Sequence, residues 1–469
     1  MKEYTLSELI DGLNEGLFTS KALVEAYLER IYQYDQNGPK LNSIGEINPD
    51  CLVLAEQLDV ERKQSGPRSI FHGIPIVVKD NINTHDKMHT TAGSLALSDL
   101  YAPYDATIVK KLRDAGAIIL GKANLSEFAY FMSFDSMPSG FSSRYGQVKH
   151  PYNEAIDPLG SSTGSAVSVA ANLIPVSIGT ETNGSLMAPS IQNSIVSLKP
   201  TLGMVSRHGI IPISAHQDTA GPMARNVKDC AILMDFIYGR DINDPITLTN
   251  PNKTYQFSAA CGKDIKGLRV GILNFSNYPY GEEDRKILNE AKEKLTPLGV
   301  EFIDVDLEVK RMPNHETLIY DFKVDLNYYL NTVKGATKMS CLSDIIAFNK
   351  ENKDERMPYG QSILEAANKT TGRFIEGEYY QKRKEILREA ERMTQILNEH
   401  QLDAVISTYQ TSYAPIAGNP SICVPAKPLL DLHPKSLIFI GKKWDDEVLF
   451  SLASHYEEQT KHRVSPIFE

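Results

Sequence analysis

The pattern of apolar and polar positions predicts strands and helices that alternate through the first half of the chain. Residues 76–78 and 174–178 form short apolar runs that are typical of buried strands. The small and apolar residues of 166–171 predict a helix just before the second of these strands. Alternation of this kind is typical of an α/β fold built in layers.

The two ends of the chain show other patterns. Over residues 21–31 apolar positions recur at helical spacing, and Thr19 or Ser20 is suited to cap the helix. Farther along, the pattern predicts two strands and two helices: strands at 270–273 and 300–305, helices at 282–295 and 316–333. The segment of about 310–400 is mainly charged helix with a polar loop at 349–357, and it could cover the mouth of an active site.

Two serine-containing segments flank the predicted helix and strand. Residues 160–165 read Gly-Ser-Ser-Thr-Gly-Ser, and residues 182–185 read Thr-Asn-Gly-Ser. A helix of about ten residues rises roughly 15 Å, and a strand of five residues returns roughly 16 Å. Because the two paths nearly cancel, Ser161 and Ser185 can meet at one end of the two elements.

Both segments offer backbone groups that favour negative charge. Ser161 lies just before the predicted helix, where N–H groups lack partners and the helix dipole is positive. Residues 179–185 are rich in types suited to turns, so consecutive N–H groups could point at a single oxygen. An oxyanion hole is commonly built in this way.

A lysine adds the base that such serines need. Lys79 follows the apolar run 76–78, so its ammonium should emerge at the edge of a buried core, where desolvation lowers the pKa. A lysine that is neutral part of the time can accept a proton, and a serine hydroxyl needs such a base to become a good nucleophile. Lys79 and two serines therefore make a self-sufficient proton relay.

Residues 160–164 also fit Gly-x-Ser-x-Gly, the nucleophile elbow of α/β-hydrolases, with Ser162 at its centre. That motif needs a strand immediately before it. The preceding residues contain Asp157 and Pro158, and proline lacks the N–H that a strand uses for pairing. The sequence therefore disfavours an esterase of this kind.

The three segments make the chain resemble the amidase signature family, whose pattern is followed in order at 73–80, 160–171 and 179–189. The resemblance implies one amidase domain over 1–469 with a signature core at about 65–235. It also implies an α/β fold with one large mixed, twisted sheet and helices on both faces.

Carried over position by position, the resemblance makes Ser185 the nucleophile, Ser161 the bridging serine and Lys79 the base. Ser161 would follow a cis peptide bond with Gly160. The oxyanion would be held by the backbone N–H groups of four residues: Thr182, Asn183, Gly184 and Ser185. Ser185 would attack an amide carbonyl, release ammonia or an amine, and form an acyl-enzyme that water hydrolyses. The family chemistry requires no metal or organic cofactor.

The chain departs from the commonest family pattern at Thr163, Glu181 and Asn183. Variants of this form are most similar to the peptide amidase branch, whose members remove the C-terminal amide of peptides. Met187 stands two residues after the nucleophile, where the glutaminase subunit of the tRNA-dependent amidotransferase usually has an arginine. The departures therefore favour a hydrolase over a transamidation subunit.

Apolar residues between positions 128 and 141 lie where relatives shape the pocket for the acyl group. The candidate substrate-binding residues there are Phe131, Met132 and Ser133, which suggests an apolar acyl group. A plain hydrophobic core would show the same cluster.

Composition and charge argue against nucleic-acid binding, membrane insertion, secretion and metal binding. A net charge of −10 with no tract of lysine or arginine argues against a nucleic-acid partner. No apolar run is long enough to cross a membrane, and the N-terminus lacks the apolar run of a secretory signal. The five cysteines and eleven histidines show no metal-binding spacing. We therefore expect a cytoplasmic protein, monomeric or homodimeric, with no metal.

These observations predict an amidase that hydrolyses a linear carboxylic amide, in either a small molecule or a peptide. Two alternatives stay open. One is the glutaminase subunit of a tRNA-dependent amidotransferase, and the other is a non-catalytic binding or assembly subunit that retains the fold.

Overall fold

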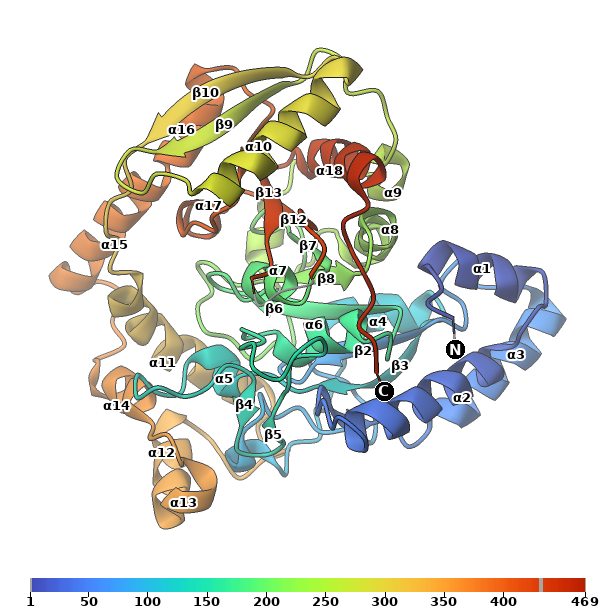
Figure 1. Ribbon diagram of the computed structural model, residues 1–469. Coiled ribbons are helices and arrows are strands. Elements are labelled where there is room, and N and C mark those ends of the chain that lie inside the picture. The colour runs from blue at the N-terminus through green and yellow to red at the C-terminus, as the bar shows by residue number, and fades with distance from the viewer. Residues whose placement is uncertain (1, 430–432, 469) are drawn as a thin grey trace.

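The computed structural model describes residues 2–429 and 433–468 (Figure 1). Its strands, in chain order, are β1 (Ile44–Ile47), β2 (Pro75–Lys79), β3 (Ile118–Ala123), β4 (Phe141–Ser142), β5 (Gly146–Gln147), β6 (Val176–Glu181), β7 (Val196–Lys199), β8 (Thr219–Ala224), β9 (Arg269–Phe275), β10 (Glu301–Leu307), β11 (Ala404–Ser407), β12 (Ser421–Pro425) and β13 (Ser436–Gly441). Within the described residues, eleven of them form one sheet in the order β1-β3-β2-β6-β8-β7-β12-β13-β11-β9-β10. β4 and β5 form a separate hairpin.

The sheet is mixed, as predicted. β2 pairs in parallel with β3 and β6, and β9 pairs in parallel with β10 and β11. Antiparallel pairs through β8, β7, β12 and β13 join these two parallel groups. The carboxyl ends of β2 and β6 therefore lie at the same edge, which is where Lys79 and the segment after Glu181 emerge.

Helices surround the sheet. They are α1 (Leu6–Asn14), α2 (Ser20–Arg30), α3 (Cys51–Ser65), α4 (Thr107–Asp114), α5 (Glu127–Tyr130), α6 (Thr163–Ala170), α7 (Met187–Gln192), α8 (Val227–Ile237), α9 (Phe257–Ala260), α10 (Glu282–Leu295), α11 (Asn314–Thr332), α12 (Leu342–Glu351), α13 (Lys353–Arg356), α14 (Ser362–Lys369), α15 (Gly377–Ala390), α16 (Arg392–Glu399), α17 (Tyr413–Ala417) and α18 (Asp446–Thr460). Every residue of β2 and of β6 is buried, as expected of strands covered on both faces. α6 and α7 pack on one face, and α8 and α18 on the other.

Most of the predicted elements are confirmed, with small shifts. The strand predicted at 174–178 begins later, at Val176, because Pro175 has no N–H for pairing, and it extends to Glu181 because that end pairs with β8. The polar loop predicted at 349–357 is wrong, since α12 and α13 occupy most of it. Lysine, glutamate and arginine favour helix there.

Apolar residues of the segment from α11 to α14 form a second hydrophobic cluster, apart from the main core, with residues of 92–100, 128–137 and 211–213. Figure 1 shows this helical segment near α5. Phe322 of α11 packs against Phe131, with ring centroids 5.0 Å apart. Ser214 donates to Asp321 on the same helix, which ties α11 to the loop before β8. Across the described residues, no helix combines the length and apolar character needed to cross a membrane.

Candidate active site

The side chain of Lys79 is fully buried at the carboxyl end of β2. Its Nζ lies 2.8 Å from Ser161 Oγ, 3.1 Å from Ser162 Oγ and 3.0 Å from Thr180 Oγ1. It also donates to the Thr180 carbonyl at 3.3 Å. All of these partners are neutral oxygens, so Lys79 has hydrogen bonds in both protonation states but no direct ion pair to hold its charge.

Burial has a large effect on this lysine. Desolvation lowers the pKa of Lys79 to about 7, and the charges of Asp218 and Glu181 limit the shift. A group that titrates near neutrality can both accept and return a proton at physiological pH. The direction of this pKa shift and its cause, desolvation, are those expected for Lys79 from the sequence.

The path of the chain brings the two serine segments together. α6 begins just after Ser162, and β6 returns to the same end of the sheet. There the Ser162 N–H donates to the carbonyl of Ser185 at 3.2 Å. Ser161 is fully buried, and its peptide bond with Gly160 is cis, as the family pattern implies.

Ser162 and Thr180 complete the surroundings of the lysine, and neither was predicted as a site residue. The Ser162 hydroxyl donates to the Thr180 carbonyl at 2.9 Å and accepts from the Thr180 N–H at 3.1 Å. Thr180 Oγ1 also accepts from Asn81 at 3.0 Å. Residues two apart on a strand point to the same face, so Thr180 lies on the same face as buried Ile178. A hydroxyl on a buried strand face was the one sign in the sequence that Thr180 has a polar partner.

Residues 182–185, the oxyanion loop, connect β6 to α7. Glu181 accepts the N–H groups of Leu186 at 2.8 Å and Met187 at 3.1 Å, which fixes the turn from inside. Gly184 has a φ of +91°, a value that glycine adopts without strain. Among the hydrogen bonds formed within residues 2–429 and 433–468, none uses the N–H groups of the four predicted oxyanion donors: Thr182, Asn183, Gly184 and Ser185. These donors remain available for an anionic oxygen.

Side chains anchor the oxyanion loop on two sides. Thr182 Oγ1 donates to Asp218 at 2.5 Å, and Asn183 Nδ2 donates to Ser412 Oγ at 3.1 Å. Asp218 also accepts the N–H groups of Ile213 and Ser214, and burial raises its pKa to about 6. The loop is therefore held by two segments that are distant in sequence.

Ser185 is half-buried at the end of the oxyanion loop. Its hydroxyl has no hydrogen-bond partner among the residues that the structure describes, so it is free to rotate toward a substrate. Lys79 and Ser161 are, in contrast, fully buried. The candidate base thus lies in the interior, while the candidate nucleophile is partly exposed.

The predicted substrate-binding residues lie in different surroundings. Phe131 and Met132 are buried in the cluster that packs against α11. The Ser133 hydroxyl contacts Ser362 Oγ and the Asp135 carboxylate, each at 3.0 Å. Their part in substrate binding stays a prediction.

Comparisons with known proteins find amidases that match most or all of the chain. A family model described as Amidase matches residues 22–421. The chain is 38% identical to a probable amidase of Arabidopsis thaliana, over all of this chain and 92% of the relative. The crystal structure of the native peptide amidase from Stenotrophomonas maltophilia is 39% identical, with a TM-score of 0.93 over 100% of this chain and 99% of the other.

One of the subunits of the glutamyl-tRNA(Gln) amidotransferase of Pseudomonas syringae pv. tomato is also similar, at 38% identity. That match covers only 64% of this chain and 60% of the relative. The match to the family model, by contrast, spans most of the chain, including Lys79 and both serine segments. The chain therefore belongs to the amidase family and is a hydrolase that acts on amides.

Proposed function

We propose that this amidase hydrolyses primary amides through an acyl-enzyme on Ser185, with Ser161 and Lys79 as the proton relay. The observation that carries the proposal is the buried contact of 2.8 Å between Lys79 Nζ and Ser161 Oγ. Neutral Lys79 takes the proton of Ser161, and Ser161 takes the proton of Ser185. The Ser185 oxygen then attacks the amide carbon.

The developing oxyanion lies against the N–H groups of the oxyanion loop, which have no other use in the described structure. Donors of this kind are typically worth about 100- to 1,000-fold in turnover. The proton then returns through Ser161 to the leaving nitrogen, and ammonia departs. Water attacks the acyl-enzyme by the same relay in reverse, which releases the carboxylic acid and restores Ser185.

The preferred substrate under this proposal is the C-terminal amide of a peptide. Two observations support it: the full-length similarity to a peptide amidase, and the departures from the commonest family pattern at Thr163, Glu181 and Asn183. The proposal includes a cytoplasmic location, a monomer or homodimer, and no metal in the reaction.

A glutaminase component of an amidotransferase is the second candidate, because the matching amidotransferase subunits are similar over part of the chain. Met187, in place of the arginine that those proteins usually carry, weighs against it. The third candidate, a non-catalytic subunit, predicts that serine-directed reagents do not label Ser185.

The test is ammonia release by the wild type and by Ser185→Ala from a panel of peptide amides, aliphatic and aromatic primary amides, and glutamine. We expect the wild type to release ammonia from peptide amides and Ser185→Ala, folded by circular dichroism, to release none. Full activity in Ser185→Ala would refute the mechanism. A preference for glutamine would support the amidotransferase candidate.

A further inference from the structure

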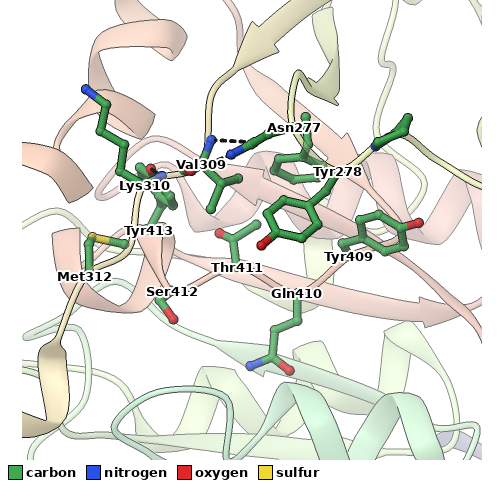
Figure 2. Close-up of a pocket in the computed structure, with 12 residues that line it drawn as sticks. Asn277, Tyr278, Val309, Lys310, Met312, Tyr409, Gln410, Thr411, Ser412 and Tyr413 are labelled. Atoms are coloured by element: carbon green, nitrogen blue, oxygen red, sulfur yellow. Dashed lines mark hydrogen bonds between the residues drawn. The ribbon is translucent and has the colours of Figure 1, made fainter.

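A cavity of about 560 Å³ lies against the segment 409–413 (Figure 2). This size falls within the range of pockets that hold small ligands. Its walls come from the loops after β9, β10 and β11. Apolar and aromatic side chains dominate them: Phe275, Tyr278, Val309, Met312, Tyr409 and Tyr413.

The loop 409–413 connects this cavity to the proposed site. Figure 2 shows Gln410 and Ser412 extending from the loop on the side away from Tyr278. Ser412 accepts the hydrogen bond from Asn183 at 3.1 Å. A Cβ atom added to Gly184 would lie only 2.1 Å from Gln410 Nε2, so the carboxamide lies directly against the glycine. Both residues also line the cavity, so one layer of side chains separates the cavity from the oxyanion loop.

The lining of the cavity suits an apolar or aromatic group. Phe275 and Tyr409 stack with ring centroids 5.9 Å apart, and together with neighbouring Tyr280 they form a rigid aromatic wall. Tyr278 stands at the cavity with 62% of its surface exposed. Its ring takes part in none of the ring contacts formed among the described residues, so one aromatic face is available to a ligand.

The chemistry of a primary amide decides which part of the substrate enters the cavity. Ammonia is the whole leaving group, so everything else belongs to the acyl part. A substrate group that enters a cavity beside the oxyanion loop therefore belongs to the acyl part. In a peptide amide, the amidated residue itself occupies the space at Ser185, and the preceding residue begins one Cα step of about 3.8 Å away.

We infer that this cavity binds the side chain of the residue that precedes the amidated residue, with selectivity for aromatic or large aliphatic side chains. Gln410 binds the peptide group between the two residues, because its exposed carboxamide offers one acceptor and two donors beside Gly184. This inference rests on the proposed function and names the sequence of the peptide that the site prefers.

The experiment compares two amides, N-acetyl-Phe-Ala-NH₂ and N-acetyl-Gly-Ala-NH₂, by kcat/KM for ammonia release. We expect the wild type to prefer the phenylalanine peptide by about tenfold or more, the scale of selectivity that an apolar pocket supplies. Tyr278→Ala should bring the ratio close to one through loss of the phenylalanine peptide alone. The matched control is Tyr380→Ala on α15, a tyrosine 56% exposed and outside the cavity, which should keep the wild-type ratio.

Gln410→Ala provides an independent readout. It should lower kcat/KM for both peptides by a similar factor, because both contain the peptide group that the carboxamide binds. Two results would overturn the cavity assignment: a wild-type kcat/KM ratio near one between the two peptides, or a preference for the phenylalanine peptide that survives in Tyr278→Ala. In either case, ammonia release by the wild type would leave the proposed function intact. No release from either peptide would overturn the proposed substrate, and the cavity assignment with it.

Discussion

Two lysines lie fully buried on neighbouring strands, and their surroundings differ. Lys79 is at the end of β2 among hydroxyl and carbonyl oxygens. Lys122 lies on β3, where its Nζ is 3.9 Å from the carboxylate of Asp80. Lys122 also donates to the carbonyl of Ile82 and, at 3.0 Å, to Thr90 Oγ1. One lysine therefore has a carboxylate as a direct partner, and the other does not.

This difference separates the proposed base, Lys79, from a buried lysine to which we assign a structural role. Burial lowers the pKa of both lysines, but at Lys122 the adjacent Asp80 opposes that shift at close range. Burial raises the pKa of the Asp80 carboxyl, and Lys122 together with hydrogen bonds from Thr91 and the N–H of Gly93 limits that rise. We therefore expect the type of partner, more than burial itself, to decide whether a buried lysine can transfer protons.

Substitution of the two lysines should affect different properties: activity for Lys79 and stability for Lys122. We expect Lys79→Met to lower kcat/KM by about 100- to 10,000-fold, the usual contribution of a general base, with little loss of stability. Steady-state ammonia release together with urea unfolding would measure both effects. Retention of near-normal activity would remove Lys79 from the relay.

Lys122→Met should mainly destabilise the protein, because Asp80 would remain buried without its cation. A loss of about 3–5 kcal/mol in the free energy of unfolding is expected from urea titration. The double variant with Asp80→Asn should recover part of that loss. If Lys122→Met instead abolished activity at unchanged stability, the distinction between the two lysines would be lost.

A smaller effect is expected from the hydroxyl partners. Thr180→Val removes a hydrogen bond of 3.0 Å to Lys79 and leaves the Asn81 amide with one partner fewer. We expect about a fivefold drop in kcat/KM, since one such bond is worth about 1 kcal/mol. Thr90→Val makes the equivalent change at Lys122 and should leave kcat/KM unchanged. Equal losses in both variants would indicate a general packing effect.

The smallest expected effect is a shift in the pH profile of kcat/KM, and it tests the role of Lys79 most specifically. Activity requires neutral Lys79, so kcat/KM should rise with pH and level off above its pKa of about 7. The negative charge of Asp218 favours protonated Lys79, so Asp218→Asn should move this limb to lower pH. Because the pKa of Asp218 is itself about 6, the comparison applies above that pH. A limb that stays in place would mean that another group controls it.

The sequence was sufficient to predict that the candidate site residues in short, continuous motifs lie close together. Ser161 and Ser185 are joined by one helix and one strand, and Lys79 follows an apolar run, so local pattern and simple geometry place them. The partners of Lys79 were missed, because Ser162 and Thr180 look like ordinary cap and strand residues until the backbone path is known.

Contacts between distant segments had no local signal at all. Gln410 and Ser412 reach the oxyanion loop from a segment that lies 229 positions beyond Asn183. Nothing in the spacing of residues 409–413 indicates this neighbour. The end of the helix at 342–351 and the helix at 353–356 were missed, because a polar segment was interpreted as a loop, although the buried contact of Asn349 with Gln361 helps to hold it.

The hydrogen bond between Asn183 and Ser412, which are 229 positions apart, also has a consequence for biosynthesis. A ribosome adds about 5–20 residues per second, so these 229 residues take roughly 11 to 46 seconds to make. Throughout that interval the nascent chain carries its lysine and both serines, but lacks one anchor of the oxyanion loop and a wall of the cavity. β12, which lies between β7 and β13, arrives later still. Assembly of the working enzyme therefore waits for the last part of translation.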